Sequence, residues 1–171
     1  MENGLEDTLK QELGHSLLRC FWELQYGHAD GNQWVAAECD VSIRPGWFYH
    51  PEEDDKVKTV DQLTDLYYRS VGHNATLLLN FPVDRNGLIH PTDSLNAVSF
   101  HQRVQKELAD NLLSSAKVSA SDERGGQFKV RGVTDGKYDT YWATNDGVTT
   151  ADLTFTFSQP TKMNRVMIQE Y

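Results

Sequence analysis

Two short strand patterns constrain the fold of this chain more than any other feature of its sequence. Apolar and polar residues alternate over 35–44, which predicts a strand with one polar face. A second strand is expected over 75–81, with three consecutive leucines at its centre. Two strands alone cannot make a sheet that buries both of its faces, so the strands belong to a larger arrangement.

Helical patterns flank these strands. The first helix is expected over 6–24, where an apolar side chain recurs every four residues. Thr59 and Gln62 have the spacing of a capping box and begin a second helix, and Thr92 or Asp93 is expected to cap a third. Alternating helices and strands are typical of parallel βα units. The residues of the third helix that are expected to face inward are Leu95, Val98, Phe100, Val104, Leu108 and Leu112.

From Ser114 onwards the pattern changes to short strands and turns. We therefore expect an α/β part over 1–113 and an all-β sandwich over 114–171. The strands expected in the second part cover 117–120, 128–130, 151–158 and 163–171.

Composition and charge exclude several classes of function. The 171 residues hold 16 Lys and Arg against 25 Asp and Glu, and this net charge of -9 argues against a nucleic-acid partner. No apolar run approaches the roughly 20 residues that span a bilayer, and residues 1–4 lack the basic start of a signal peptide. Cys20 and Cys39 fit neither a disulfide framework nor a zinc site, so both are expected to be buried thiols.

The densest group of polar and aromatic residues lies over 38–50. It combines the acid Glu38 and the base Arg44 with an aromatic run that starts at Trp47, directly after a Pro-Gly turn. An indole offers an apolar plate to the C–H face of a sugar ring, while fixed polar groups orient the hydroxyls. The segment therefore suggests a sugar-binding surface. The alternative is an amphipathic edge strand followed by an ordinary aromatic loop.

Residues 34–50 closely resemble the late-barrel signature of the family 29 glycoside hydrolases, the retaining α-L-fucosidases. The resemblance continues through 71–82 and 84–90 and covers roughly residues 22–115. The motif Val41-Ser42-Ile43-Arg44-Pro45-Gly46-Trp47 looks most like the α-1,3/1,4-fucosidase branch. The resemblance implies that residues 1–113 are the C-terminal portion of a (β/α)8 TIM barrel.

The same resemblance implies roles for individual residues. Trp47 matches the tryptophan that packs against fucose, and Glu38 and Arg44 would orient the sugar or the pocket, with a buried Glu38–Arg44 pair as the alternative. His28 would reach a leaving-group sugar or be a solvated loop residue. The family's nucleophile, an Asp in a Trp-Phe-Asp-Gly type motif, and its acid/base Glu in a Gly-Asn-Glu type loop have no match here, so no residue is assigned a catalytic role.

The second part of the chain has a resemblance of its own. Residues 133–144 resemble the opening of a discoidin-like (coagulation factor 5/8 type C, galactose-binding-like) β-sandwich of jelly-roll form. In such modules this loop often holds a structural calcium, which would make Asp135 and Thr140 its ligands. The alternative is a tight turn at Asp135-Gly136. No other cofactor is expected.

The function expected from both resemblances is that of an exo-α-L-fucosidase, which removes terminal α-L-fucose from glycans with retention. Its partners would be fucosylated glycans, and the full-length family member would be periplasmic or extracellular. Because both catalytic motifs are missing, the 171 residues alone are expected to be inactive. The alternatives are a non-catalytic carbohydrate-binding protein that uses residues 114–171, and an inactive remnant of a truncated gene. The oligomeric state stays open.

Overall fold

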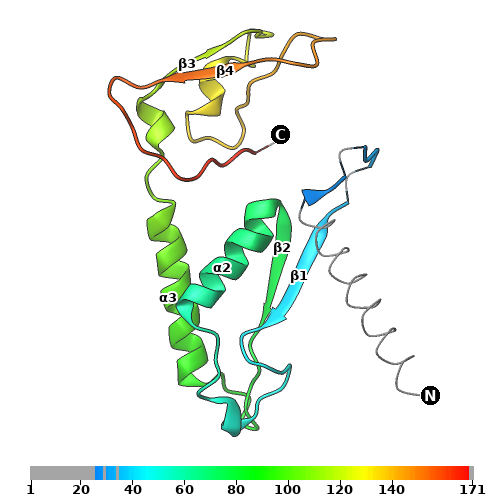
Figure 1. Cartoon of the computed structure of the whole chain (residues 1–171), viewed down its shortest axis with the longest axis vertical. Coiled ribbons are helices and arrows are strands. Elements are labelled where there is room, and N and C mark those ends of the chain that lie inside the picture. The colour runs from blue at the N-terminus through cyan, green and yellow to red at the C-terminus, as the bar shows by residue number, and fades with distance from the viewer. Residues whose placement is uncertain (1–25, 29, 34, 170–171) are drawn as a thin grey trace, which may run out of the picture. The chain divides into compact units, whose positions relative to one another are not determined.

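The computed structural model describes residues 26–28, 30–33 and 35–169. These residues form parts of two compact units, of which the first ends at Glu107 and the second begins at Leu108 (Figure 1). The predicted helix over 6–24 and Cys20 lie outside the described residues. Each unit is therefore considered by itself.

A parallel strand pair forms the sheet of the first unit. Strand β1 (Ala37–Ser42) pairs with β2 (Ala75–Asn80), in a register that runs from Ala37 opposite Ala75 to Ser42 opposite Asn80. Parallel neighbours need a crossover connection, and the helix α2 (Val60–Ser70) lies within it (Figure 1). Both predicted strands are confirmed. Each observed strand is shorter than the range predicted for it, which was 35–44 for β1 and 75–81 for β2.

Helix α2 begins at the predicted capping box. The Gln62 amide N–H donates to Thr59 Oγ1 at 3.3 Å, and the Thr59 N–H donates to Gln62 Oε1 at 2.9 Å. Two of the amide groups that a helix start leaves unpaired are thereby satisfied. Leu63 of this helix belongs to the hydrophobic core, in which Ile43 and Val57 are also buried. The partly buried residues packed against this core are Leu66, Leu79, Phe81 and Phe100.

Helix α3 (Pro91–Glu107) packs against α2 and begins earlier than predicted. Because Pro91 occupies its first position, which proline tolerates well, Thr92 and Asp93 lie inside the first turn and do not cap it. The predicted inward face is also partly wrong. Phe100 and Val104 are half-buried, but four of the six side chains expected to face inward are exposed by 40% or more, namely Leu95, Val98, Leu108 and Leu112.

A buried ion pair joins the end of β1 to the start of α3. Arg44 Nε and Nη2 each donate to one carboxylate oxygen of Asp93 at 2.8 Å, and both side chains are fully buried. Arg44 Nη2 also lies 2.9 Å from the Asp54 carboxylate. The hydrogen bonds to Asp93 raise the pKa of Arg44 above its ordinary value, although burial works in the opposite direction.

The second unit contains one antiparallel pair, β3 (Lys117–Ala120) with β4 (Leu153–Thr156). The strand predicted over 128–130 is wrong, because a turn precedes it and a 3-10 helix (Val130–Val133) follows. The strand predicted over 163–171 is absent from the described part of that range, 163–169, where no neighbouring strand of the described chain supplies ladder hydrogen bonds. The full β-sandwich is thus not confirmed. Among the described residues, no helix has the length and apolar character for a bilayer crossing.

We expect Asp93→Asn to lower the free energy of unfolding by about 3 kcal/mol, because it leaves the buried Arg44 guanidinium without its main counter-charge. Urea denaturation followed by circular dichroism measures the change. The matched control is Asp65→Asn, which removes a carboxylate from an exposed pair with Arg69 and should cost less than about 1 kcal/mol. Equal unfolding midpoints for the two variants would contradict this account.

The Cys39 thiol is half-buried beside Asp40, and burial first and the Asp40 carboxylate second raise its pKa. A raised pKa means less thiolate at a given pH. In a Cys20→Ser background, the pH profile of iodoacetamide labelling should therefore show a higher apparent pKa for the native chain than for the chain in urea, where Cys39 approaches its ordinary value near 8.5. Coincident profiles would disprove the shift.

Candidate functional site

The candidate site lies at the edge of the parallel sheet where β1 and β2 end. Ser42 is the last residue of β1 and Asn80 the last of β2, and the two are partners in register. The segment that leaves β1, residues 45–50, is called the aromatic loop below; it carries Trp47, Phe48 and Tyr49. Loops that follow the carboxyl ends of parallel strands commonly hold binding and catalytic residues.

Asn80 connects the ends of both strands to the aromatic loop. Its Nδ2 donates to Ser42 Oγ at 3.1 Å and to the main-chain carbonyl of Trp47 at 3.1 Å. A carbonyl oxygen only accepts hydrogen bonds, so the amide nitrogen must face Trp47, and this contact fixes the orientation of the amide group. The loop is therefore attached to β2 as well as to β1.

Lys58 caps the end of β1 with a positive charge. Its ammonium donates to the Ser42 carbonyl at 2.7 Å and to the Arg44 carbonyl at 3.4 Å. The Lys58 carbonyl in turn accepts a hydrogen bond of 3.0 Å from the Asn96 side chain of α3. The main chain that enters the aromatic loop is thus held by a cation on one side and by α3 on the other.

Arg44 contacts two residues of the aromatic loop, Tyr49 and His50. Its Cζ lies 4.6 Å from the centre of the Tyr49 ring, and Nη1 donates to the His50 carbonyl at 3.4 Å. The Tyr49 hydroxyl donates to Asp54 at 3.4 Å, and burial together with the Asp54 charge raises the pKa of Tyr49 above its ordinary value. Arg44 therefore faces protein groups, and it acts on the loop instead of reaching out to a ligand.

The aromatic side chains above this support are accessible. Trp47 is 52% exposed and Phe48 77% exposed, so the indole has one surface free for a ligand while its main chain is held. This is the arrangement that a stacking plate for a sugar needs. The contact of Trp47 with a sugar stays a prediction.

Glu38 lies on the exposed face of β1, and it is not the partner of Arg44. Ser42 lies four positions after Glu38, which corresponds to about 13 Å along an extended strand. Arg44 lies beyond the end of the strand and pairs with Asp93 and Asp54. The predicted Glu38–Arg44 pair is therefore wrong, because an extended backbone carries the two side chains too far apart.

His28 is not brought to the aromatic loop. It lies in the segment that precedes β1, whereas the aromatic loop follows that strand. The nearby Tyr26 ring makes an edge contact with His73, at 5.2 Å between ring centroids, and His73 directly precedes the turn into β2. The segment around His28 thus borders the amino ends of the strands, at the opposite edge of the sheet from Trp47.

Asp135 and Thr140 hydrogen-bond to each other. Thr140 Oγ1 donates to the two carboxylate oxygens of Asp135 at 2.9 and 2.8 Å, and the Lys137 N–H donates to Oδ1 at 3.0 Å. The Lys137 and Thr140 hydrogen bonds lower the pKa of Asp135. Gly136 has a φ of +72°, so the tight turn explains this loop. The described residues hold no cluster of three His, Cys, Asp or Glu that could hold a metal ion.

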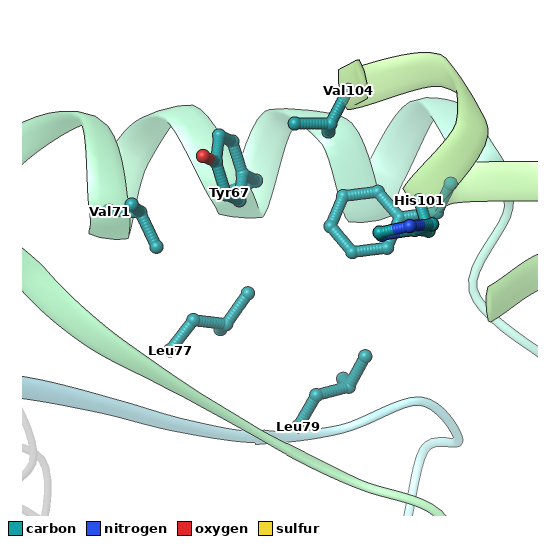
Figure 2. Close-up of a pocket in the computed structure, with 7 residues that line it drawn as sticks. Tyr67, Val71, Leu77, Leu79, His101 and Val104 are labelled. Atoms are coloured by element: carbon teal, nitrogen blue, oxygen red, sulfur yellow. The ribbon is translucent and has the colours of Figure 1, made fainter. Parts of the chain in front are cut away.

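A separate cavity of about 310 Å³ lies between β2 and the helices of the first unit (Figure 2). Leu77 and Leu79 point into it from β2, opposite Tyr67, Val71 and Val104. Its lining is mostly apolar, and it lies on the helix-covered face of the sheet, away from the edge with Trp47. None of the residues of the aromatic loop lines it, so it is treated as separate from the candidate site.

Sequence reasoning missed Asn80, Lys58 and Asp93. Asn80 had a usable signal, because it is the first polar residue after the three consecutive leucines of the predicted strand. Asp93 was interpreted as a helix cap, and nothing local shows that its partner lies 49 residues away. Lys58 carries no signal at all in a single sequence.

No family model matches the chain. The chain is 38% identical to alpha-L-fucosidase 1 of Arabidopsis thaliana over 149 residues, which are 85% of this chain and 29% of that protein. Among solved structures, the GH29 fucosidase of Ruminococcus gnavus in complex with fucose matches with a TM-score of 0.66 and 36% identity, over 74% of this chain and 26% of that one.

A glycoside hydrolase 29 family member from an unknown rumen bacterium matches with a TM-score of 0.53 and 45% identity, over 61% of this chain and 18% of that chain. The chain spans less than a third of the length of the curated relatives that it matches. In sequence and in the fold of its described parts, the chain belongs to the family 29 glycoside hydrolases.

Proposed function

We propose that this chain supplies the substrate-binding edge of a retaining α-L-fucosidase, which removes terminal α-L-fucose from fucosylated glycans. The observation that carries the proposal is the half-exposed Trp47 indole, whose main chain is hydrogen-bonded at the carboxyl edge of a parallel strand pair. The names of the relatives support the substrate class, since one similar structure is a fucosidase solved in complex with fucose.

The proposal includes the architecture around the site. Strands β1 and β2 would be neighbouring strands of a (β/α)8 barrel, with α2 as the crossover helix between them. The second unit would be the beginning of a discoidin-like β-sandwich. The antiparallel β3–β4 pair and the resemblance of residues 133–144 support that assignment. The whole protein would act in the periplasm or outside the cell.

The proposed division of chemistry follows from what retaining glycosidases need. One carboxylate attacks the anomeric carbon and a second carboxyl group, about 5 to 5.5 Å away, serves as acid and then as base. Neither the Trp-Phe-Asp-Gly type nor the Gly-Asn-Glu type motif occurs in the 171 residues. We therefore assign sugar binding to these residues and leave bond cleavage to carboxyl groups from other segments of the barrel.

Trp47→Ala should weaken the binding of L-fucose to the chain about tenfold or more, because it removes the apolar plate while leaving the hydrogen bond to the Trp47 carbonyl in place. Saturation-transfer-difference NMR with the full chain measures the binding, and D-fucose is the stereochemical control. Tyr138→Ala, which truncates a 78% exposed aromatic residue of the second unit, is the matched control and should leave binding unchanged. Unaltered binding in Trp47→Ala would favour a carbohydrate-binding protein that uses the second unit.

The 171-residue chain should bind L-fucose without hydrolysing an aryl α-L-fucoside, since no residue in it is assigned as nucleophile or as acid/base. A spectrophotometric assay for released phenolate, run against buffer alone, measures the rate. Glu38→Gln and Asp40→Asn are the decisive controls, because these two carboxylates are exposed on β1. Turnover that either substitution abolishes would make β1 a source of catalytic residues and overturn this division of chemistry.

A further inference from the structure

We propose that Asn80 is the positioning residue of the site, whose side-chain amide sets the orientation of Trp47 toward the sugar. The expected effect of Asn80 on sugar binding rests on the proposed function. The expected effect of Asn80 on the orientation of Trp47 is independent of the proposed function. Asn80 itself is not assigned a contact with the substrate.

The geometry gives the Asn80 amide two simultaneous tasks. One N–H is donated to Ser42 Oγ, which belongs to the neighbouring strand, and the other is donated to the Trp47 carbonyl, which belongs to the aromatic loop. Both distances are 3.1 Å, and both donor positions of the amide are then used. A single side chain thus fixes the loop relative to the ends of β1 and β2.

Few other contacts hold the loop at this point. Within the part of the chain that the structure describes, no backbone–backbone hydrogen bond involves Trp47, and half of its surface is open to solvent. The other attachments of the loop lie two or three residues later. Arg44 Cζ lies 4.6 Å from the centre of the Tyr49 ring, the Tyr49 hydroxyl donates to Asp54 at 3.4 Å, and the His50 carbonyl accepts from Arg44 Nη1 at 3.4 Å and from the Glu53 N–H at 3.0 Å. Within the described residues, the hydrogen bond from Asn80 is thus the polar contact made to the Trp47 main chain itself, and this contact is the basis for assigning the orientation of the half-exposed indole to Asn80.

Asn80→Asp tests this inference with almost no change of side-chain volume. The introduced carboxylate cannot donate to the Trp47 carbonyl and is repelled by its oxygen. The full chain is labelled with 5-fluorotryptophan, and its four tryptophans give fluorine NMR signals that single Trp→Phe variants assign. At pH 7 the signal of Trp47 should shift or broaden in Asn80→Asp, while the other three stay in place. Asn32→Asp, on an exposed residue of the segment before β1, is the matched control and should change none of them.

A pH titration separates positioning from general damage to the fold. Protonation returns a donor to the introduced carboxyl group, which has an ordinary pKa near 3.9 and a higher one beside a carbonyl oxygen. The Trp47 signal of Asn80→Asp should therefore move back toward that of the unmodified chain as the pH falls from 7 to 4. Damage to the fold would not reverse on acidification. A Trp47 signal that does not respond to the substitution at pH 7, or does not return at pH 4, would overturn the inference.

A second variant covers the case in which Asn80→Asp does not fold cooperatively. Asn80→Ala removes both N–H donors of the amide without introducing a charge. We expect it to shift or broaden the Trp47 signal at pH 7 while the other three signals stay in place. A Trp47 signal that Asn80→Ala leaves unchanged would count against the inference.

Titration with L-fucose in the same spectra separates this inference from the proposed function. We expect the sugar to shift the Trp47 signal of the unmodified chain, with an affinity about tenfold weaker in Asn80→Asp at pH 7. If the substitution shifts the Trp47 signal but L-fucose never does, positioning stands and the proposed function fails. If L-fucose shifts the signal and the substitution does not, the proposed function stands and positioning fails.

Discussion

The buried ion pair between Arg44 and Asp93 is the interaction on which the rest of the site depends. Burying two charges is costly, and the cost is offset only where the geometry satisfies their hydrogen bonds. Here the guanidinium uses a bidentate contact to Asp93, a contact with Asp54 and a hydrogen bond to the His50 carbonyl. The end of β1, the aromatic loop and the first turn of α3 therefore cannot separate without leaving a charge unpaired in the core.

This support allows the loop to present an exposed aromatic side chain without being mobile as a whole. Lys58 holds the carbonyls at the end of β1, and Asn80 holds the carbonyl of Trp47 itself. Each contact acts on main-chain atoms, so the indole stays available to a ligand. A binding surface that is fixed before the ligand arrives loses less conformational entropy on binding. In the proposed sugar site, Lys58 and Asn80 would therefore contribute to recognition indirectly, by holding the main chain that carries the Trp47 indole.

The parts of this fold that could be predicted from the sequence are those with a local cause. The alternation over 35–44 predicted β1, and the Thr59–Gln62 spacing predicted the capping box. The site could not be predicted in the same way, because it depends on contacts between residues far apart in the sequence. Asp93, for example, has the local pattern of a helix cap, but it pairs with Arg44, which lies 49 residues away. Resemblance to a family identified Trp47 but not Asn80, whose role depends on a main-chain carbonyl 33 residues away. The position of Asn80 after an apolar strand marks it as a candidate, but a single sequence carries no signal for its partner.

The order of polar residues along β1 sharpens what each can do. Glu38, Asp40 and Ser42 alternate with half-buried residues and so share one face of the strand. With about 3.3 Å per residue, Glu38 lies roughly 13 Å before Ser42, and the aromatic loop lies beyond that end. A hydrogen bond needs a separation near 3 Å. Glu38 therefore cannot hydrogen-bond to the groups at the end of the strand, whereas Asn80 Nδ2 lies 3.1 Å from the Ser42 hydroxyl oxygen there.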